Sequence, residues 1–318
     1  MKFCVAVTDL DWFDFLSKKS SEGKLEDVNF WRPGGSNFTA LTQGGPILFK
    51  LKSPRNVIAG IGFFTSFSRL PVTAAWQYFG KKNGFDTYIE FKNRIFSHNY
   101  SHGSSSDNPK IGNIILTDPI FFNQSQWIEP PVDWSSNIVS YKLYSTEDHV
   151  GKILWHQIED TLNQYHFFDR KPDEKSPFKI ETPKDDFQKR YLSKVRYGQS
   201  SFRMSLTNAY DKRCVISGVD VLPVLEAAHI KPYASSGPHF VSNGLLLKSD
   251  IHELFDTGYI TITNEMKIEV SKKLQHKYER GELYHNRYHG QKLILPESIK
   301  EKPAQTFIDW HNQNVYNG

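Results

Sequence analysis

Two histidines and one asparagine near the middle of the second half of the chain stand at a spacing that suits catalysis. His229 precedes Asn243 by fourteen residues, and Asn243 precedes His252 by nine. The surrounding residues predict a strand that ends at His229, a loop, a second strand that Asn243 opens, and a helix that carries His252. Two strands and a helix in this order can gather the three side chains around one divalent cation. The pattern indicates metal-assisted hydrolysis of a phosphodiester.

Each of the three residue types has a role in that chemistry. Water is a poor nucleophile, so a general base must take its proton, and His229 at a strand end is the candidate. Asn243 can bridge the loop by hydrogen bonds and fix the tautomer of the imidazole. His252 can offer a ring nitrogen to the metal. Any one of them alone is more often an ordinary core or turn residue, and the combined spacing is what favours a site.

The sequence around these residues resembles the HNH endonucleases of the ββα-metal fold, in their restriction-type branch. The resemblance rests on residues 213–218, 225–232, 242–247 and 251–256 and covers about 196–318. It implies that His229 is the general base, Asn243 the organiser and His252 a metal ligand. It also implies one divalent metal per site, Mg²⁺ or Mn²⁺ or another transition metal.

The segment departs from that family in two places. Many members carry a metal-binding Asp or His where this chain has Ala228, so Asp256 or Glu226 is expected to supply a ligand, or water and phosphate oxygens complete the shell. Cys214 stands alone, with Ser217 where a second cysteine would be, so no structural zinc is expected and packing must hold the hairpin. The other histidines of this half lie in no comparable pattern and are interpreted as surface or core groups. They are His239, His276, His285, His289 and His311.

The first 145 residues predict many short strands and a few helices. Expected strands cover 3–9, 27–31, 47–51, 57–65, 111–116 and 138–143, and expected helices cover 11–18, 71–79 and 88–95. Gly60 and Gly62 suggest bulges or tight bends. The pattern favours a compact, partly closed β-barrel with helical insertions.

Five segments of this first part resemble the EVE domain of the PUA-like superfamily. They are residues 8–13, 28–33, 48–54, 60–64 and 75–80. The resemblance implies that residues 1–145 hold a modified base in an aromatic-walled pocket of a small barrel. A base taken out of a duplex loses stacking energy, which aromatic walls restore.

Trp31 and Trp12 are the candidate walls of that pocket. Asp11 and Asn29 are candidates for the hydrogen-bonding edge of the base. Packing in the core explains either tryptophan as an alternative, and helix capping explains Asp11 equally well. Candidate contacts to flanking phosphates are Arg32, Lys50, Lys52 and Arg55, with Gln199 and Arg203 on an expected helix at 199–210.

Length and composition set the wider frame. The 318 residues suggest about two domains, predicted at 1–145 and 196–318, with a helix and a charged, proline-containing linker at 146–195. The formal net charge of +4 permits a nucleic-acid partner without requiring one. The fold class expected is α+β. We expect a cytoplasmic, prokaryotic protein, because no signal peptide or membrane-spanning run is found.

These features predict a modification-dependent endonuclease. Its expected substrate is double-stranded DNA with a flipped 5-methyl or 5-hydroxymethyl cytosine, cut by a homodimer or by paired monomers. Two kinds of alternative remain open. The first is a nuclease specific for phosphorothioate DNA or for RNA. The second is a non-catalytic reader of modified DNA with a degenerate hairpin, which Ala228 would favour.

Overall fold

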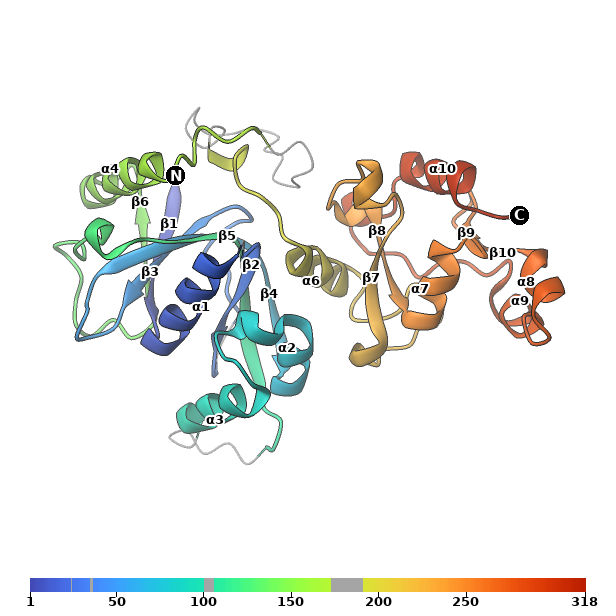
Figure 1. Cartoon of the computed structure of the whole chain (residues 1–318), viewed down its shortest axis with the longest axis horizontal. Helices are drawn as coiled ribbons and strands as arrows, with labels where there is room; N and C mark the ends of the chain where they lie inside the picture. The colour runs from blue at the N-terminus through green and yellow to red at the C-terminus, as the bar shows by residue number, and fades with distance from the viewer. Residues whose placement is uncertain (24, 35–36, 100–105, 173–190) are drawn as a thin grey trace. The chain divides into compact units, whose positions relative to one another are not determined.

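A computed structural model describes residues 1–23, 25–34, 37–99, 106–172 and 191–318 of the chain (Figure 1). The chain divides into two compact units, Met1–Ser201 and Phe202–Gly318. None of the helices in the described ranges has the length and apolar character that crossing a membrane requires. Most of the predicted linker's charged part, residues 173–190, lies outside the described residues.

The first unit is built on one mixed sheet of six strands. They are β1 (Lys2–Thr8), β2 (Asp27–Arg32), β3 (Pro46–Leu51), β4 (Ile58–Pro71), β5 (Lys110–Phe121) and β6 (Tyr141–Ser145). Their order is β2-β5-β4-β3-β1-β6, in which β1 pairs with β3 in parallel and the other neighbours are antiparallel. The predicted α+β class is confirmed. The predicted barrel needs one correction, because the described strands leave β2 and β6 as edges and do not close.

The bends in the sheet occur where the sequence predicts them. The pairing of β4 with β5 shifts register between Ile61 and Phe63, on either side of Gly62. A Cβ atom at Gly60 would lie 2.6 Å from the carbonyl oxygen of Ile120 and 2.8 Å from the Phe49 ring. Glycine therefore lets the strands approach closely enough for Phe49 to be fully buried.

The described part of the first unit has four longer α-helices beside this sheet. They are α1 (Leu10–Glu22), α2 (Val72–Phe79), α3 (Tyr88–Asn99) and α4 (His149–Gln164). The apolar side of α1, with Trp12, Phe13 and Leu16, belongs to one core cluster. The apolar side of α4, with Leu154 and Trp155, belongs to a second. The predicted helices at 11–18, 71–79 and 88–95 correspond to the first three.

Part of the segment predicted as helix and linker packs into the core of the first unit. Helix α4 lies within 146–195, and its apolar face is buried with Phe3 and Val5 of β1. An amphipathic helix next to an open core gains free energy by covering it, which explains why α4 belongs to the first unit, Met1–Ser201.

Helix α6 (Gln199–Ala209) begins against a buried carboxylate of the first unit. Asp27 on β2 has no exposed surface and accepts hydrogen bonds from the backbone N–H groups of Ser200 and Ser201, at 2.9 and 3.1 Å. Lys82 donates to the same carboxylate at 2.6 Å. Asp27 thus satisfies donors of the first helical turn that would otherwise be unpaired.

The second unit contains two small hairpins and several short helices. Its elements are β7 (Leu225–His229), β8 (Gly244–Lys248), α7 (Ser249–Asp256), β9 (Ile260–Ile262), β10 (Ile268–Val270), α8 (Lys272–Lys277), α9 (Glu282–Tyr288) and α10 (Gln305–Asn314). The chain also has 3-10 turns at Gly80–Asn83, Gln124–Gln126, Leu222–Val224, Tyr233–Ser235, Val241–Asn243 and Ile299–Glu301. Strands β7 and β8 pair antiparallel and lead directly into α7, so the predicted ββα arrangement is confirmed.

Candidate functional site

The hairpin and helix place the three predicted residues as the sequence suggests. His229 is the last residue of β7 and pairs across the hairpin with Gly244, the first residue of β8. Asn243 immediately precedes β8, and His252 lies in the first half of α7. Three buried leucines of β8, Leu245–Leu247, anchor the hairpin in the core of the unit.

The side chain of Asn243 closes the loop between the two strands. Its Oδ1 accepts from the N–H of Lys231 at 2.9 Å, and its Nδ2 donates to the carbonyl oxygens of Lys231 and Pro238 at 3.0 and 2.9 Å. The residue has no exposed surface. These bonds are to backbone groups of the loop, so Asn243 fixes the conformation of the loop. His229 directly precedes this loop, and His239 lies within it.

The ring of His229 is held between two partners. It stacks on Phe202 with the ring centroids 4.1 Å apart, and its Nε2 lies 3.1 Å from Nδ1 of His239. Burial, together with the nearby His239 and His252, lowers the pKa of His229 to about 4, although the Asp256 carboxylate opposes the shift. At neutral pH the ring is therefore uncharged, which a general base requires.

His252 lies between two carboxylates. Its Nδ1 is 2.7 Å from Oε2 of Glu226 on β7, and its Nε2 is 3.3 Å from Oδ2 of Asp256, one turn along α7. Burial alone would lower the pKa of His252, but hydrogen bonds to Asp256 and Glu226 outweigh it and raise the pKa to about 9. In this state the ring carries a proton on each nitrogen and a positive charge shared with both acids.

The turn before the hairpin keeps its shape by hydrogen bonds. Sγ of Cys214 accepts from the N–H groups of Ser217 and Lys248, at 3.4 and 3.3 Å. The N–H of Gly218 donates to the carbonyl oxygen of Cys214, and Gly218 has a φ of 71°. The hydrogen bond from Lys248 to the sulfur of Cys214 joins this turn to the end of β8.

The first unit contains a separate cavity of about 450 Å³. Its lining includes both predicted tryptophans, several other aromatic rings and a set of charged side chains. These aromatic and charged lining residues include Asp9, Trp12, Phe30, Trp31, Arg32, Phe38, Lys52 and Tyr141.

Both indoles are held by hydrogen bonds to the backbone. Nε1 of Trp31 donates to the carbonyl oxygen of Asn83, and Nε1 of Trp12 donates to that of Asn29, each at 3.0 Å. Trp31 is half-buried and packs against Phe91, whereas only 2% of Trp12 is exposed. Trp31 is therefore the more exposed of the two indoles.

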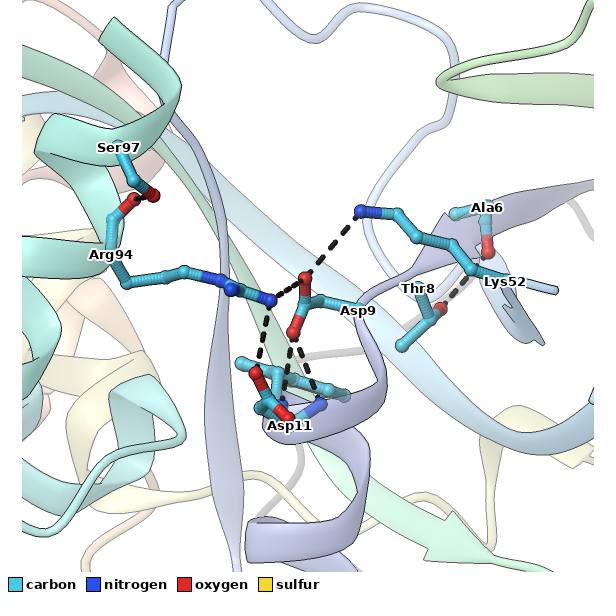
Figure 2. A network of polar contacts seen from close by, with 8 residues as sticks. Ala6, Thr8, Asp9, Asp11, Lys52, Arg94 and Ser97 are labelled. Carbon is cyan, nitrogen blue, oxygen red and sulfur yellow. Dashed lines mark hydrogen bonds and ion pairs between the residues drawn. The ribbon is translucent and has the colours of Figure 1, made fainter. Parts of the chain in front are cut away.

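Asp9 is the carboxylate in the cavity lining, and it was not among the residues that the sequence singled out. Figure 2 shows its side chain between Arg94 and Lys52. Its Oδ1 caps α1 by accepting from the N–H groups of Asp11 and Trp12, and its Oδ2 pairs with Arg94 at 2.6 Å and with Lys52 at 3.5 Å. Burial opposes the charge, but the hydrogen bond and charge of Arg94 and the charge of Lys52 hold the pKa of Asp9 below its usual value.

The two predicted polar residues of the pocket lie elsewhere. The Asp11 carboxylate is mostly exposed and pairs with Arg94 at 3.1 Å, and it does not line the cavity. Asn29 has no exposed surface, and its Nδ2 donates to Oδ1 of both Asn83 and Asn113. Asn29 thus belongs to a buried amide network that holds β2 in the sheet.

The predicted phosphate contacts fall into two groups. Arg32 and Lys52 line the cavity, where Arg32 lies over the Tyr141 ring. Three other candidates contact groups of their own unit. Lys50 is 5% exposed, bonds to Asn56 and lies over Trp134; Arg55 pairs with Asp14; and Arg203 donates to the carbonyl oxygen of Leu225 at 2.9 Å. Gln199 is exposed at the start of α6.

Comparison with known families identifies the hairpin. Residues 214–263 match the family model for HNH endonucleases. This segment is an HNH endonuclease domain. It contains His229, Asn243, His252 and both candidate acids. No curated protein matches the chain.

Solved structures show only distant likenesses. A mutant form of the ASCH protein from Zymomonas mobilis is 16% identical, covers 48% of this chain and 96% of its own, and has a TM-score of 0.32. The modification-dependent restriction endonuclease TagI is 14% identical, covers 92% of this chain and 76% of its own, and has a TM-score of 0.28. No conclusion about activity follows from likenesses this weak.

Two side chains of the HNH domain form an ion pair whose spacing is also the one that a shared divalent cation would require. Two ligand atoms that each lie about 2.1 Å from a shared cation are about 3.0–3.4 Å apart, and Nε2 of His252 and Oδ2 of Asp256 are 3.3 Å apart. Imidazole nitrogen and carboxylate oxygen are both suitable donors for such ions. Within the described ranges, no group of three or more His, Cys, Asp or Glu side chains is arranged to hold a metal.

His239 is the residue of the HNH domain that the sequence analysis did not single out. It touches the Nε2 edge of His229, and its own ring stacks on Tyr233 with the centroids 4.6 Å apart. Its position in a loop without periodicity gives no local signal, so only the observed 3.1 Å contact reveals it. In the part of the chain that the structure describes, Nε2 is thus the nitrogen of His229 that contacts His239.

Replacing His239 by alanine should lower the rate of cleavage about 10- to 100-fold, because an imidazole without its orienting partner samples unproductive positions. The substitution also removes a group that lowers the pKa of His229. The acidic limb of the pH–rate profile should therefore move to higher pH. His239→Asn, which can still bond to Nε2, should restore much of the rate. An unchanged profile in His239→Ala would contradict a positioning role.

Proposed function

We propose that this protein is an endonuclease that cleaves double-stranded DNA carrying a modified cytosine. The observation that carries the proposal is the presence, in one chain, of an HNH hairpin with an uncharged histidine and a separate aromatic cavity of about 450 Å³. The first unit would recognise the modified base, and the second would cut the backbone. Cutting both strands needs two such sites, and therefore a homodimer or paired monomers.

His229 would act as the general base of the hydrolysis. Nε2 is engaged by His239, so Nδ1 takes the proton from the attacking water. Stacking on Phe202 keeps the ring in a single plane. Asn243 holds the loop on which this arrangement depends, since hydrogen bonds of its side chain and backbone join the two loop ends.

His252 and Asp256 would hold the divalent metal, through Nε2 and Oδ2. Both nitrogens of His252 are protonated without the metal, so metal binding would release the Nε2 proton. When bound, the metal stabilises the negative charge that develops on the phosphate and the leaving oxygen. Glu226 contacts Nδ1 of His252, the ring nitrogen that does not face Asp256. Its role would therefore be to orient the His252 ring and not to bind the cation. With two side-chain ligands, water and phosphate oxygens would complete the shell.

The cavity of the first unit would take the flipped cytosine between aromatic walls. Trp31 and Phe30 are half-buried rings of the lining, and Trp12 is a buried one. Asp9 would accept a hydrogen bond from the cytosine amino group, the role that the sequence analysis gave to Asp11 and Asn29. Arg32 and Lys52 at the same cavity would neutralise flanking phosphates.

Digestion of three forms of one plasmid tests the proposal. The purified chain would be incubated with unmodified, 5-methylcytosine and 5-hydroxymethylcytosine plasmid, with and without Mn²⁺. Cleavage confined to a modified plasmid and dependent on the metal is expected. Equal cleavage of all three forms would remove the modification from the proposal. A phosphorothioate plasmid and an RNA of the same sequence, as further arms, separate the remaining nuclease alternatives.

A non-catalytic reader of modified DNA is the second candidate, and Ala228 favours it. This residue is fully buried and cannot supply the metal ligand that many HNH members have there. A reader would bind modified plasmid tightly and leave every form intact at any metal concentration. His229→Ala would then change nothing that can be measured.

Replacing Trp31 by alanine should reduce the preference for modified over plain DNA. Stacking of a base on an aromatic ring is worth about 1–3 kcal/mol, which corresponds to roughly 5- to 150-fold in affinity. The measurement is the ratio of dissociation constants for matched modified and plain duplexes. Trp134→Ala is the control, because Trp134 is also half-buried but does not line the cavity. A full preference in Trp31→Ala would take Trp31 out of the pocket.

A further inference from the structure

A short segment beyond the HNH hairpin holds an unusual share of positive charge. Between residues 267 and 292 there are seven lysines and arginines against three glutamates, an excess of four. The formal net charge of the whole chain is also +4, so the remaining residues balance one another. The segment comprises β10, α8 and α9, which follow one another in Figure 1, and it lies outside the residues that match the HNH family.

Most of these cations face solvent without a carboxylate partner. Lys272, Lys273, Lys277, Arg280 and Arg287 are exposed. In the part of the chain that the structure describes, none of the five forms an ion pair within 4.0 Å; Lys277 instead donates to the hydroxyl of Tyr259 at 3.0 Å. Their charge is therefore available to an anionic partner.

Two of these cations, Lys273 and Lys277, line an open hollow of about 410 Å³. Its lining consists of Tyr259, Lys273, His276, Lys277 and Asn317 and includes no acidic side chain among the residues that the structure describes. Two lysines, a hydroxyl, an imidazole and an amide can all donate hydrogen bonds to phosphate oxygens. A lining of donors without a carboxylate favours an anion over a metal cation as the occupant.

Hydrogen bonds connect the residues of the hollow to the end of α7, the helix that carries the candidate metal ligands. Tyr259 lies three residues after Asp256, and its carbonyl oxygen accepts from the N–H of Ser271 at 2.9 Å. The hydroxyl of Ser271 donates to the carbonyl oxygen of Asn317 at 2.6 Å, and Nδ2 of Asn317 donates to that of Thr257 at 3.0 Å. A phosphate in the hollow would therefore be held in a fixed relation to the end of α7.

We propose that this hollow, with Lys273 and Lys277 at its centre, binds a backbone phosphate of duplex DNA away from the bond that is cut. The inference rests on the proposed function and adds a contact that neither the hairpin nor the cavity of the first unit supplies. Such a contact carries no sequence information and sets the position of the duplex. It acts equally on modified and unmodified DNA.

The salt dependence of DNA binding tests the inference. Dissociation constants for a short unmodified duplex and its modified form would be measured in EDTA over a range of NaCl concentrations. In the double variant Lys273→Ala/Lys277→Ala, the slope of log K against log salt should become less negative by about 1 for each lost phosphate contact. Affinity at low salt should fall about 10- to 100-fold, by the same factor for both duplexes.

Two variants serve as controls. Lys18→Ala/Lys152→Ala removes the same charge from exposed sites on α1 and α4 and should keep the wild-type slope. Tyr259→Phe removes the hydrogen bond to Lys277 but leaves both lysine charges, so its slope should change little. Melting temperatures confirm that each variant is folded.

The possible failures are distinguishable. A wild-type slope in the Lys273/Lys277 variant, with cleavage of modified plasmid intact, would overturn this inference alone. A change in the ratio between modified and plain duplexes would also overturn it, because a backbone contact cannot discriminate between them. If the wild-type chain bound no duplex at any salt concentration, the inference and the proposed function would both be wrong.

Discussion

Cleavage of modified plasmid by the His229→Ala variant should be slower by roughly 10²- to 10⁴-fold, the usual contribution of a general base. The reason is specific to this site: the ring is uncharged at neutral pH, stacked on Phe202 and engaged through one nitrogen only. Single-turnover cleavage with saturating Mn²⁺ measures the effect. Binding of the modified duplex in EDTA should stay at the wild-type level, since the cavity that we propose for the base belongs to the first unit.

His156→Ala is a matched control, because His156 is an exposed histidine on α4, outside both the hairpin and the cavity. It should cleave at the wild-type rate. A melting temperature for His229→Ala separates lost chemistry from lost stability, since removing a stacked ring leaves a gap beside Phe202. If the variant cleaved at the wild-type rate, another group would have to be the base. If it lost DNA binding, the division of roles between the units would be wrong.

Replacing Asp256 by asparagine should remove most of the metal affinity of the HNH domain. Asp256 and His252 are the pair whose oxygen and nitrogen are 3.3 Å apart, and an amide keeps the shape of the acid while losing its charge. Titration of Mn²⁺ into the protein without DNA should show binding in the wild type and little binding in Asp256→Asn. The concentration of Mn²⁺ for half-maximal cleavage should rise in parallel.

Two neighbouring acids make the test sharper. Glu226→Gln should bind one Mn²⁺ with an affinity weaker by about 10- to 100-fold, because Glu226 orients the other nitrogen of His252. Glu253→Gln, an exposed position next to His252 on the same helix, should bind as the wild type does. The assignment of ligands would be reversed if Glu226→Gln abolished binding while Asp256→Asn retained it.

The hairpin was predictable from sequence because its elements are local. His229, Asn243 and His252 lie within 24 residues, and the strand–loop–strand–helix order leaves few ways to arrange them. The apolar run of β8 buries Leu245–Leu247 as expected for a strand with a covered face. Asp256 was also foreseeable, because residues four apart on a helix share a face.

The cavity of the first unit was predictable only in part. Trp31 and Trp12 line it, but its carboxylate is Asp9 rather than Asp11. The two acids are two residues apart, and the choice between them depends on where α1 begins. Asp9 caps the helix with one oxygen and turns the other toward Arg94, a residue 85 positions away in the chain. Nothing within a local window of sequence contains that pairing.

Buried polar partners explain the remaining differences. The side chain of Asn29 donates hydrogen bonds to Asn83 and Asn113. Lys50 donates to Asn56 and lies over the ring of Trp134. Arg203 meets the backbone of β7 at Leu225. Each looks like a possible ligand contact in the sequence, because a polar side chain on a strand or helix gives no indication of what will face it.

The sequence by itself determined the α+β class, the HNH hairpin and the places of His229, Asn243 and His252 on its elements, because these elements are local and follow one another directly. Only the tertiary structure decided that the sheet stays open, that His239 contacts His229 and that Asp9 faces the cavity. These three features depend on contacts between residues that are far apart in the chain, or that are separated by a loop whose conformation no local pattern specifies. Such contacts are selected by the packing free energy of the folded chain rather than by any local pattern.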